Sequence, residues 1–212
     1  MARLCRVRPG HDDHVTRVFR RVAGPVSAAC LAAALLCASR NAAAHEPATY
    51  EVKAAFLTNF AKFAEWPADT LPDGAPMTFC VMGDEEVASA IERLVKTRPA
   101  PGRQIKVLRL KVDLLSRHQE SALQACHLLY VSGIDAKLWP VLLAAIETKP
   151  VFSVSDSAGF AERGGLAALY VELKRMHFAI NVDTMRRSGL HLSAGLLSLA
   201  KIVKDDPNGA HR

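Results

Sequence analysis

The sequence predicts an α/β fold, with a single domain built on a mixed, mostly parallel sheet that helices cover on both faces. Two observations predict it. Short, almost wholly apolar runs that are typical of buried strands alternate with segments of helical periodicity. Near the end of the chain, two strand-like segments follow one another across a short turn. Because such spacing suits a hairpin, we expect a late antiparallel strand pair added to the sheet.

Residues 1–44 are predicted to be a signal peptide rather than part of this domain. Three arginines precede the apolar run 22–38, and three alanines end the segment, as in a basic start, an apolar middle and a small-residue cleavage site. The apolar run is short and rich in alanine for a membrane span, although an uncleaved anchor is the alternative. We therefore expect an exported protein with its domain over 45–204 and a polar tail over 205–212.

The basic charge of the chain belongs mostly to this leader. The whole chain has a net charge of +6, but residues 1–44 hold seven of the 27 Lys and Arg and two of the 21 Asp and Glu. That leaves 20 basic and 19 acidic residues for 45–212, a net charge of +1. Nucleic-acid binding loses its main support, because the basic surface that it needs is not in the expected domain.

The first predicted element of the domain is a helix over 50–67, which Trp66-Pro67 ends. A stripe of three phenylalanines on one side consists of Phe56, Phe60 and Phe63. Lys53 lies within this aromatic arc and Asn59 lies at its edge. The helix therefore either packs in the core with the Lys53 amine reaching out to solvent, or offers a surface to a partner.

Seven elements are expected between this helix and residue 156. They alternate between buried strands, which are short and apolar, and helices with one apolar side. In order, they are strand 77–83, helix 85–96, strand 104–111, helix 114–124, strand 127–132, helix 136–148 and strand 150–156. A loop rich in proline and glycine is expected over 97–102.

Three elements complete the predicted domain. The strands 166–173 and 176–183 form the antiparallel pair, joined near Lys174-Arg175, and an apolar helix follows over 190–203. The order of elements is that of an open α/β sheet, in which ligands collect beyond the carboxyl ends of the parallel strands.

Two of the five cysteines, Cys80 and Cys126, lie outside the leader. Both fall at the start of predicted strands, and in an oxidising compartment they are candidates for a disulfide. The bridge would close a loop of about 45 residues and contribute about 4 kcal/mol on the chain-entropy model. Two buried free thiols are the alternative.

The loop 156–165, with sequence DSAGFAERGG, has the highest density of candidate binding residues. It follows the carboxyl end of a predicted strand, and it could bring together Phe160, Glu162 and Arg163 to line a ligand pocket. The alternative is a structural turn with solvated charges.

A second candidate is one face of the strand 176–183 and its entry. Arg175, His177 and Asn181 alternate along it and would point the same way. Such a face could bind a small acidic or aromatic ligand, or it could be the polar outer face of an edge strand.

Catalytic patterns are scarce in this sequence. The serines have no adjacent base, no GxSxG or HExxH motif occurs, and the histidines lack the spacing of metal ligands. The sequence therefore predicts a protein that is not an enzyme and that holds neither a metal nor a cofactor.

Taken together, these segments resemble the YfiR/HmsC-like family of periplasmic proteins. The resemblance covers roughly residues 50–203 in the family's order. The residues that carry it are Val52–Leu57, Asn59–Phe63, Glu65–Pro67, Phe79–Gly83, Cys126–Ser132, Ser155-Asp156, Gly159–Gly165 and Phe178–Asn181.

The resemblance implies a function that composition could not indicate. Family members are exported α/β proteins, often dimeric, and the best understood ones repress an inner-membrane diguanylate cyclase by holding its periplasmic sensor region. Cys80 and Cys126 match positions that are paired in the founding member. That member has a second cysteine pair around the segment corresponding to 163–170, and its absence here argues against redox control through that pair.

The leading hypothesis is a non-catalytic periplasmic regulator that binds the sensor domain of a membrane diguanylate cyclase or sensor kinase. Such a regulator is expected to lower cyclic-di-GMP and biofilm output, to bind no nucleic acid and to span no membrane after signal cleavage. A homodimer is one option for its assembly. The alternative is a small-ligand binding protein that uses the Glu162-Arg163 loop. The residues expected to contact the partner or ligand are Lys53, Asn59, Phe160, Glu162, Arg163, Arg175, His177 and Asn181.

Overall fold

The computed structural model describes residues 46–97, 103–111, 117–147 and 149–206. The predicted signal peptide, most of the loop 97–102, the start of the helix 114–124 and the end of the polar tail lie outside the described residues.

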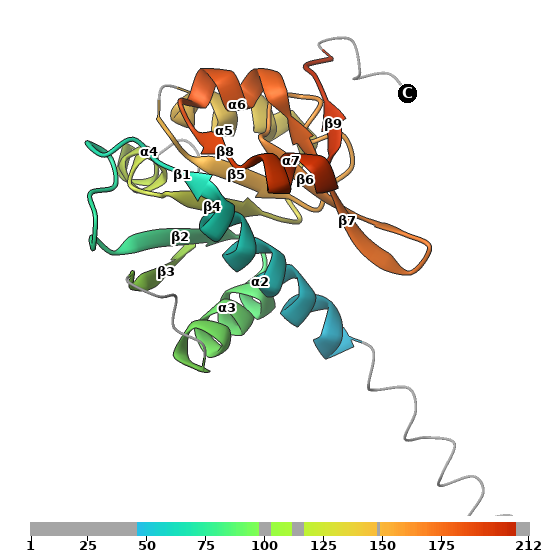
Figure 1. Ribbon diagram of the computed structural model, residues 1–212, viewed down its shortest axis with the longest axis horizontal. Helices are drawn as coiled ribbons and strands as arrows, with labels where there is room; N and C mark the ends of the chain where they lie inside the picture. The colour runs from blue at the N-terminus through green and yellow to red at the C-terminus, as the bar shows by residue number, and fades with distance from the viewer. Residues whose placement is uncertain (1–45, 98–102, 112–116, 148, 207–212) are drawn as a thin grey trace, which may run out of the picture. The chain divides into compact units, whose positions relative to one another are not determined.

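The described residues form a mixed sheet, as the sequence predicts, although it has seven strands and not the six that were expected (Figure 1). Its strand order is β3-β2-β4-β5-β6-β7-β9, and the pairs from β3 to β6 are parallel, β6 and β7 are antiparallel, and β9 is parallel to β7. The strands are β2 (Met77–Met82), β3 (Ile105–Leu110), β4 (Leu128–Val131), β5 (Phe152–Ser155), β6 (Ala167–Glu172), β7 (Arg175–Asn181) and β9 (Lys201–Val203).

Helices cover both faces of this sheet. The described helices are α2 (Glu46–Phe63), α3 (Glu85–Thr97), α4 (Arg117–Gln124), the 3-10 turn η1 (Ala136–Leu138), α5 (Trp139–Ile146), α6 (Val182–Ser188) and α7 (Ala194–Leu199). Alternate strand residues supply the two cores. Phe79 and Val81 belong to the cluster on the side of α2 and α3, whereas Cys80 and Met82 belong to the cluster that includes Leu142 of α5.

The opening helix ends earlier than the sequence predicts. α2 stops at Phe63, and Ala64–Glu65 forms the short strand β1, which pairs antiparallel with β8 (His191–Leu192). Proline disfavours the helical conformation in the residue before it, and the pairing with β8 extends that non-helical stretch by two more residues. Phe63 is 48% exposed and lies outside the core, whereas Phe60 of the same stripe is fully buried.

The predicted helix over 190–203 is also wrong. This segment forms β8, the six-residue helix α7 and the strand β9. Ser193 caps α7 by accepting a hydrogen bond from the Leu196 amide, and the backbone becomes extended at Ala200. Tertiary pairing overrides the helical propensity of the apolar run, because β9 completes the sheet beside β7.

The strand order places a crevice at the carboxyl ends of β2 and β4. The chain leaves β2 to form β3 on one side and later forms β4 on the other side, which is the topological switch point where α/β sheets bind ligands. Gly83 follows β2 there with a φ of 85°, and a Cβ atom at this position would overlap the carbonyl oxygen of Ser132. The two loops therefore pack directly against each other.

Candidate functional site

Lys53 of α2 lies over this crevice and turns its amine inward. Its Nζ is 2.7 Å from Oδ2 of Asp156 and 3.6 Å from Oδ2 of Asp84, and the residue is only 9% exposed. Asp84 comes directly after the Met82-Gly83 end of β2, and Asp156 comes directly after β5. One ammonium group thus joins α2 to the carboxyl ends of two strands.

Tyr130 of β4 forms the floor of this cluster. It is fully buried, and the Lys53 Nζ is 5.9 Å from the centre of its ring and 5.7 Å from that of Tyr50. The Tyr130 hydroxyl makes no hydrogen bond of good geometry within the described part of the chain. Burial, and then the negative charge of Asp156, raise the pKa of Tyr130 far above its usual value.

The charged side chains of the cluster stabilise one another in their charged forms. Burial alone would raise the pKa of Asp156, but the hydrogen bond and the charge of Lys53 outweigh it, so that this pKa lies below its usual value. Asp84 accepts a hydrogen bond from the Val87 amide and so caps the first turn of α3. The crevice is therefore occupied by the ammonium group of the protein's own chain.

Sequence reasoning identified Lys53 but missed its partners Asp84, Asp156 and Tyr130 as a cluster. The signal that could have found the two aspartates is positional, since each is the first acidic residue after a buried strand. The structure shows that the Lys53 amine contacts carboxylates rather than solvent. The role of Lys53 in partner binding stays a prediction.

Asn59 does not share this surface. It lies six positions along α2 from Lys53, is exposed, and lines a shallow groove with Leu94 of α3 and Ile105 of β3. The two residues that the sequence assigns to one side of α2 therefore occupy different environments.

The loop 156–165 is held together by its own contacts. Phe160 is fully buried, with its ring 5.2 Å from that of Trp139 in an edge-on arrangement. Gly165 packs so closely on Phe160 that a Cβ atom there would overlap the ring. The Arg163 guanidinium lies 4.0 Å from the Trp139 ring centre and donates hydrogen bonds to the carbonyls of Ala158 and Gly159. The Glu162 carbonyl accepts a hydrogen bond from the Asp206 amide.

A cavity of about 270 Å³ lies between α5, α6 and this loop. Its polar and charged lining consists of three basic residues, three hydroxyl residues and one carboxylate. These residues are Lys149, Arg163, Arg187, Ser153, Thr184, Ser188 and Glu147. Arg163 is thus beside a cavity, as the ligand-binding alternative requires, whereas Phe160 belongs to the packed core.

The three residues of the second predicted site, Arg175, His177 and Asn181, differ in their exposure to solvent. Asn181 is fully buried, where its side chain caps α6 and donates to the Ala161 carbonyl and to Asp205. Arg175 is exposed, and His177 is half-buried with its ring stacked on Tyr170 at 5.7 Å. Only Arg175 and His177 are therefore accessible to a partner.

The disulfide between Cys80 and Cys126 is present, as predicted, with the two Cα atoms 5.8 Å apart. It links β2 to the residue that lies two positions before β4. The bridge thus ties together the two strands whose carboxyl ends form the crevice.

No helix among the described residues combines the length and apolar character that crossing a membrane requires. No group of three or more His, Cys, Asp or Glu side chains in the same residues is arranged to hold a metal ion.

Solved structures share this fold at low sequence identity. A conserved domain protein from Vibrio cholerae O1 biovar El Tor matches with a TM-score of 0.52 and 12% identity, over 74% of this chain and 60% of that one. The open, ligand-free CD0873 of Clostridium difficile, a substrate binding protein with adhesive properties, matches with a TM-score of 0.50 and 14% identity, over 72% of this chain and 58% of that one. The chain thus spans about three fifths of the length of these proteins, and the likeness concerns the fold alone.

The sequence match to a protein family is more specific than these structural matches. The model of the family described as YfiR/HmsC-like matches residues 50–201, which is well over half of the chain and nearly all of the described sheet and helices. The chain therefore belongs to the YfiR/HmsC-like family.

Proposed function

We propose that the protein acts in the periplasm, where it binds the sensor region of an inner-membrane diguanylate cyclase, or of a related membrane signalling protein, and represses it. The family match over residues 50–201 carries this proposal, because membership of this family supports a periplasmic regulatory role without catalysis. Repression would lower cyclic-di-GMP and biofilm output.

The occupied crevice supports a regulator over a carrier of small molecules. In open α/β sheets the ligand enters at the switch point. Here Lys53, Asp84 and Asp156 fill that position with an internal ion pair. A ligand at this position would compete with the Lys53 amine for Asp156, and the ion pairs join α2 to the ends of the strands.

We place the partner contact at Arg175 and His177 on β7, with Asn59 on α2 as a second region. Phe160 and Asn181 are fully buried and would contribute through the fold. The protein would repress by binding the inactive state of the cyclase more tightly than the active state, because a binder with equal affinity for both states shifts nothing.

Deleting the gene for this protein is expected to raise cellular cyclic-di-GMP, because the cyclase then loses its repressor. The measurement is the nucleotide level in cell extracts of the deletion strain, with the same strain supplied with the wild-type gene as the control. An unchanged level in the deletion strain contradicts the proposed function.

The second candidate, a small-ligand binding protein, rests on the cavity beside Arg163. A ligand that binds only the folded state raises the melting temperature, and the rise grows with the logarithm of the ligand concentration once that concentration exceeds the Kd. Pure protein screened against small carboxylates and phosphates without any partner is expected to show such a rise if the cavity is a site. The variant Ala144→Trp, which fills the cavity, is expected to abolish that rise, and Ala194→Trp outside the cavity is the control. The absence of any shift contradicts this candidate.

A further inference from the structure

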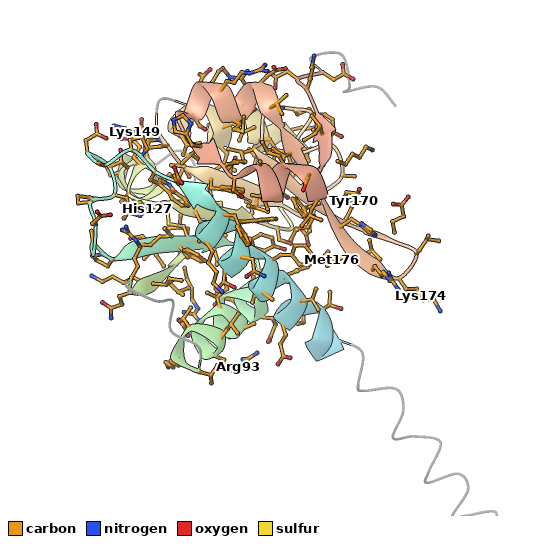
Figure 2. The ribbon with its side chains drawn as sticks, viewed as in Figure 1. Arg93, His127, Lys149, Tyr170, Lys174 and Met176 are labelled. Atoms are coloured by element: carbon orange, nitrogen blue, oxygen red, sulfur yellow. A yellow bond between two sulfur atoms is a disulfide. The ribbon has the colours of Figure 1, made fainter. Side chains whose placement is uncertain are left out.

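The β6–β7 hairpin extends beyond the strands on either side of it. β5 pairs with β6 only at Ala167 and Ala168, and β9 pairs with β7 only over 179–181. Within the described residues, the rest of β6 and β7 pair solely with each other. Figure 1 shows the hairpin projecting from the body of the domain, and Figure 2 places Lys174 at its far end.

The tip of this hairpin has an unusual composition. Leu173 and Lys174 form the turn with φ values of 49° and 63°, a left-handed conformation for which two-residue hairpins favour Asn-Gly. Leu173 is 91% exposed and Val171 is 65% exposed. Leu173 and Lys174 are unfavourable in this left-handed turn, and Leu173 is also exposed to water. We infer that these side chains serve binding and not the stability of the turn.

The outer edge of β7, over 175–178, also presents backbone groups without a strand beside them. In an antiparallel pair, alternate residues direct their N–H and C=O groups away from the partner strand. Basic residues such as Lys174 and Arg175 are a common way to protect an edge from pairing, but an exposed Leu173 beside them has the opposite effect. The basic residues therefore protect this edge from strand pairing only in part.

The two faces of the hairpin differ in chemistry. One face carries Tyr170 stacked on His177, the cross-strand pair of Glu172 and Arg175, and Lys201, whose Nζ lies 6.0 Å from the Tyr170 ring centre. Glu172 is the one acidic residue of the hairpin sequence.

The opposite face is apolar. It carries Val171 opposite Met176, and Leu169 opposite Phe178, whose ring lies 6.0 Å from that of Phe56 on α2. A strand that pairs with β7 would therefore meet cationic and aromatic groups on one face and apolar groups on the other.

We propose that this open edge of β7, residues 175–178, is a strand-addition site for an extended segment in which acidic and apolar residues alternate. Successive side chains of an added strand point to opposite faces, so that its acidic residues reach Arg175 and Lys201 while its apolar residues reach Met176 on the other face. The inference rests on the proposed function, because the segment belongs to the repressed partner.

A lipid surface fits the same observations less well. Leu173, followed by Lys174 and Arg175, would suit an anionic bilayer, but lipid offers no hydrogen bonds to the exposed backbone of 175–178. A polypeptide strand satisfies those groups.

The test measures binding of labelled peptides to the purified protein by fluorescence anisotropy. The probe is a nine-residue peptide of alternating Glu and Val, and the comparison peptide alternates Lys and Val. The Glu-Val peptide is expected to bind at least about tenfold more tightly, with affinity that falls as salt rises. N-methylation of alternate residues on its pairing edge is expected to abolish binding. Equal binding of both peptides, or no effect of N-methylation, overturns strand addition.

A tip variant separates recognition from folding. Leu173→Asn with Lys174→Gly supplies the residues that the turn favours, so the melting temperature is expected to rise while affinity for the Glu-Val peptide falls at least about tenfold. Met176→Thr on the edge strand is expected to weaken binding, whereas Val141→Thr on α5, at 48% exposure, is the control and leaves binding unchanged. Unchanged affinity in the tip variant overturns the proposal.

Two further results distinguish the possible failures. If the protein binds phosphatidylglycerol vesicles, loses that binding in the tip variant and ignores the Glu-Val peptide, the hairpin is a lipid-binding element and the strand-addition proposal is wrong. If deletion of the gene raises cyclic-di-GMP but the tip variant represses as wild type does, the proposed function holds and this inference fails.

Discussion

Lys53→Met is expected to lower the free energy of unfolding by about 3–5 kcal/mol at neutral pH, the range for breaking a buried ion pair from one side. The substitution keeps the apolar stem of the side chain but leaves Asp156 and Asp84 close to each other without a cation. Urea unfolding followed by circular dichroism measures the change. Lys62→Met on the exposed side of the same helix is the matched control and is expected to change stability by less than about 0.5 kcal/mol.

The pH dependence identifies the cause of this loss. The pKa of Asp156 is lowered in the folded protein, so its pairing with Lys53 contributes stability that is present above the ordinary carboxyl pKa near 4 and is lost as pH falls through the lowered value. The deficit of Lys53→Met is therefore expected to be largest near pH 7 and to be smaller near about pH 2, below the ordinary carboxyl pKa. Lys53→Met with Asp156→Asn is expected to recover part of the stability. A deficit that is the same at both pH values would show that packing, and not charge, is responsible.

The second large effect concerns the disulfide between Cys80 and Cys126. Replacing both residues by alanine is expected to lower the free energy of unfolding by about 4 kcal/mol, because the bridge closes a loop with a sequence separation of 46 and restricts the unfolded chain.

Reductant provides the control for the disulfide. Dithiothreitol is expected to destabilise the wild-type protein by a similar amount and to leave the double-alanine variant unchanged. If the reduced and oxidised wild-type proteins unfold at the same urea concentration, the bridge does not stabilise the domain.

The sheet could be predicted from local pattern because its central strands are buried on both faces. The runs that became β2, β4 and β5 are almost wholly apolar, and such runs have few other places in a soluble domain. The hairpin of β6 and β7 was predicted in the same way, with its turn displaced by one residue to Leu173-Lys174.

The C-terminal segment shows where local pattern fails. The run 190–203 is apolar enough for a helix, but Leu192 pairs with Ala64 and Ile202 pairs with Ile180. These partners are distant in sequence, so no window along the chain contains the information that makes β8 and β9 strands.

Single residues of the candidate site could be predicted from the sequence, but their contacts with one another could not. The polarity pattern singles out Lys53 because an amine interrupts an aromatic stripe. Its partners Asp84 and Asp156 lie 31 and 103 positions away and meet it only through the strand order. Conversely, Asn181 alternates with His177 along β7 as predicted, but β9 pairs with β7 at this residue. The Asn181 side chain is buried and caps α6.

The central claim is that this protein restrains a membrane signalling enzyme from the periplasmic side. The most direct test adds purified protein to spheroplasts of the deletion strain, whose periplasmic membrane face is open to the medium, and measures cyclic-di-GMP over time. The account predicts that the nucleotide level falls as the protein concentration rises, and that heat-denatured protein has no effect. A level that stays the same at every concentration of folded protein would contradict it.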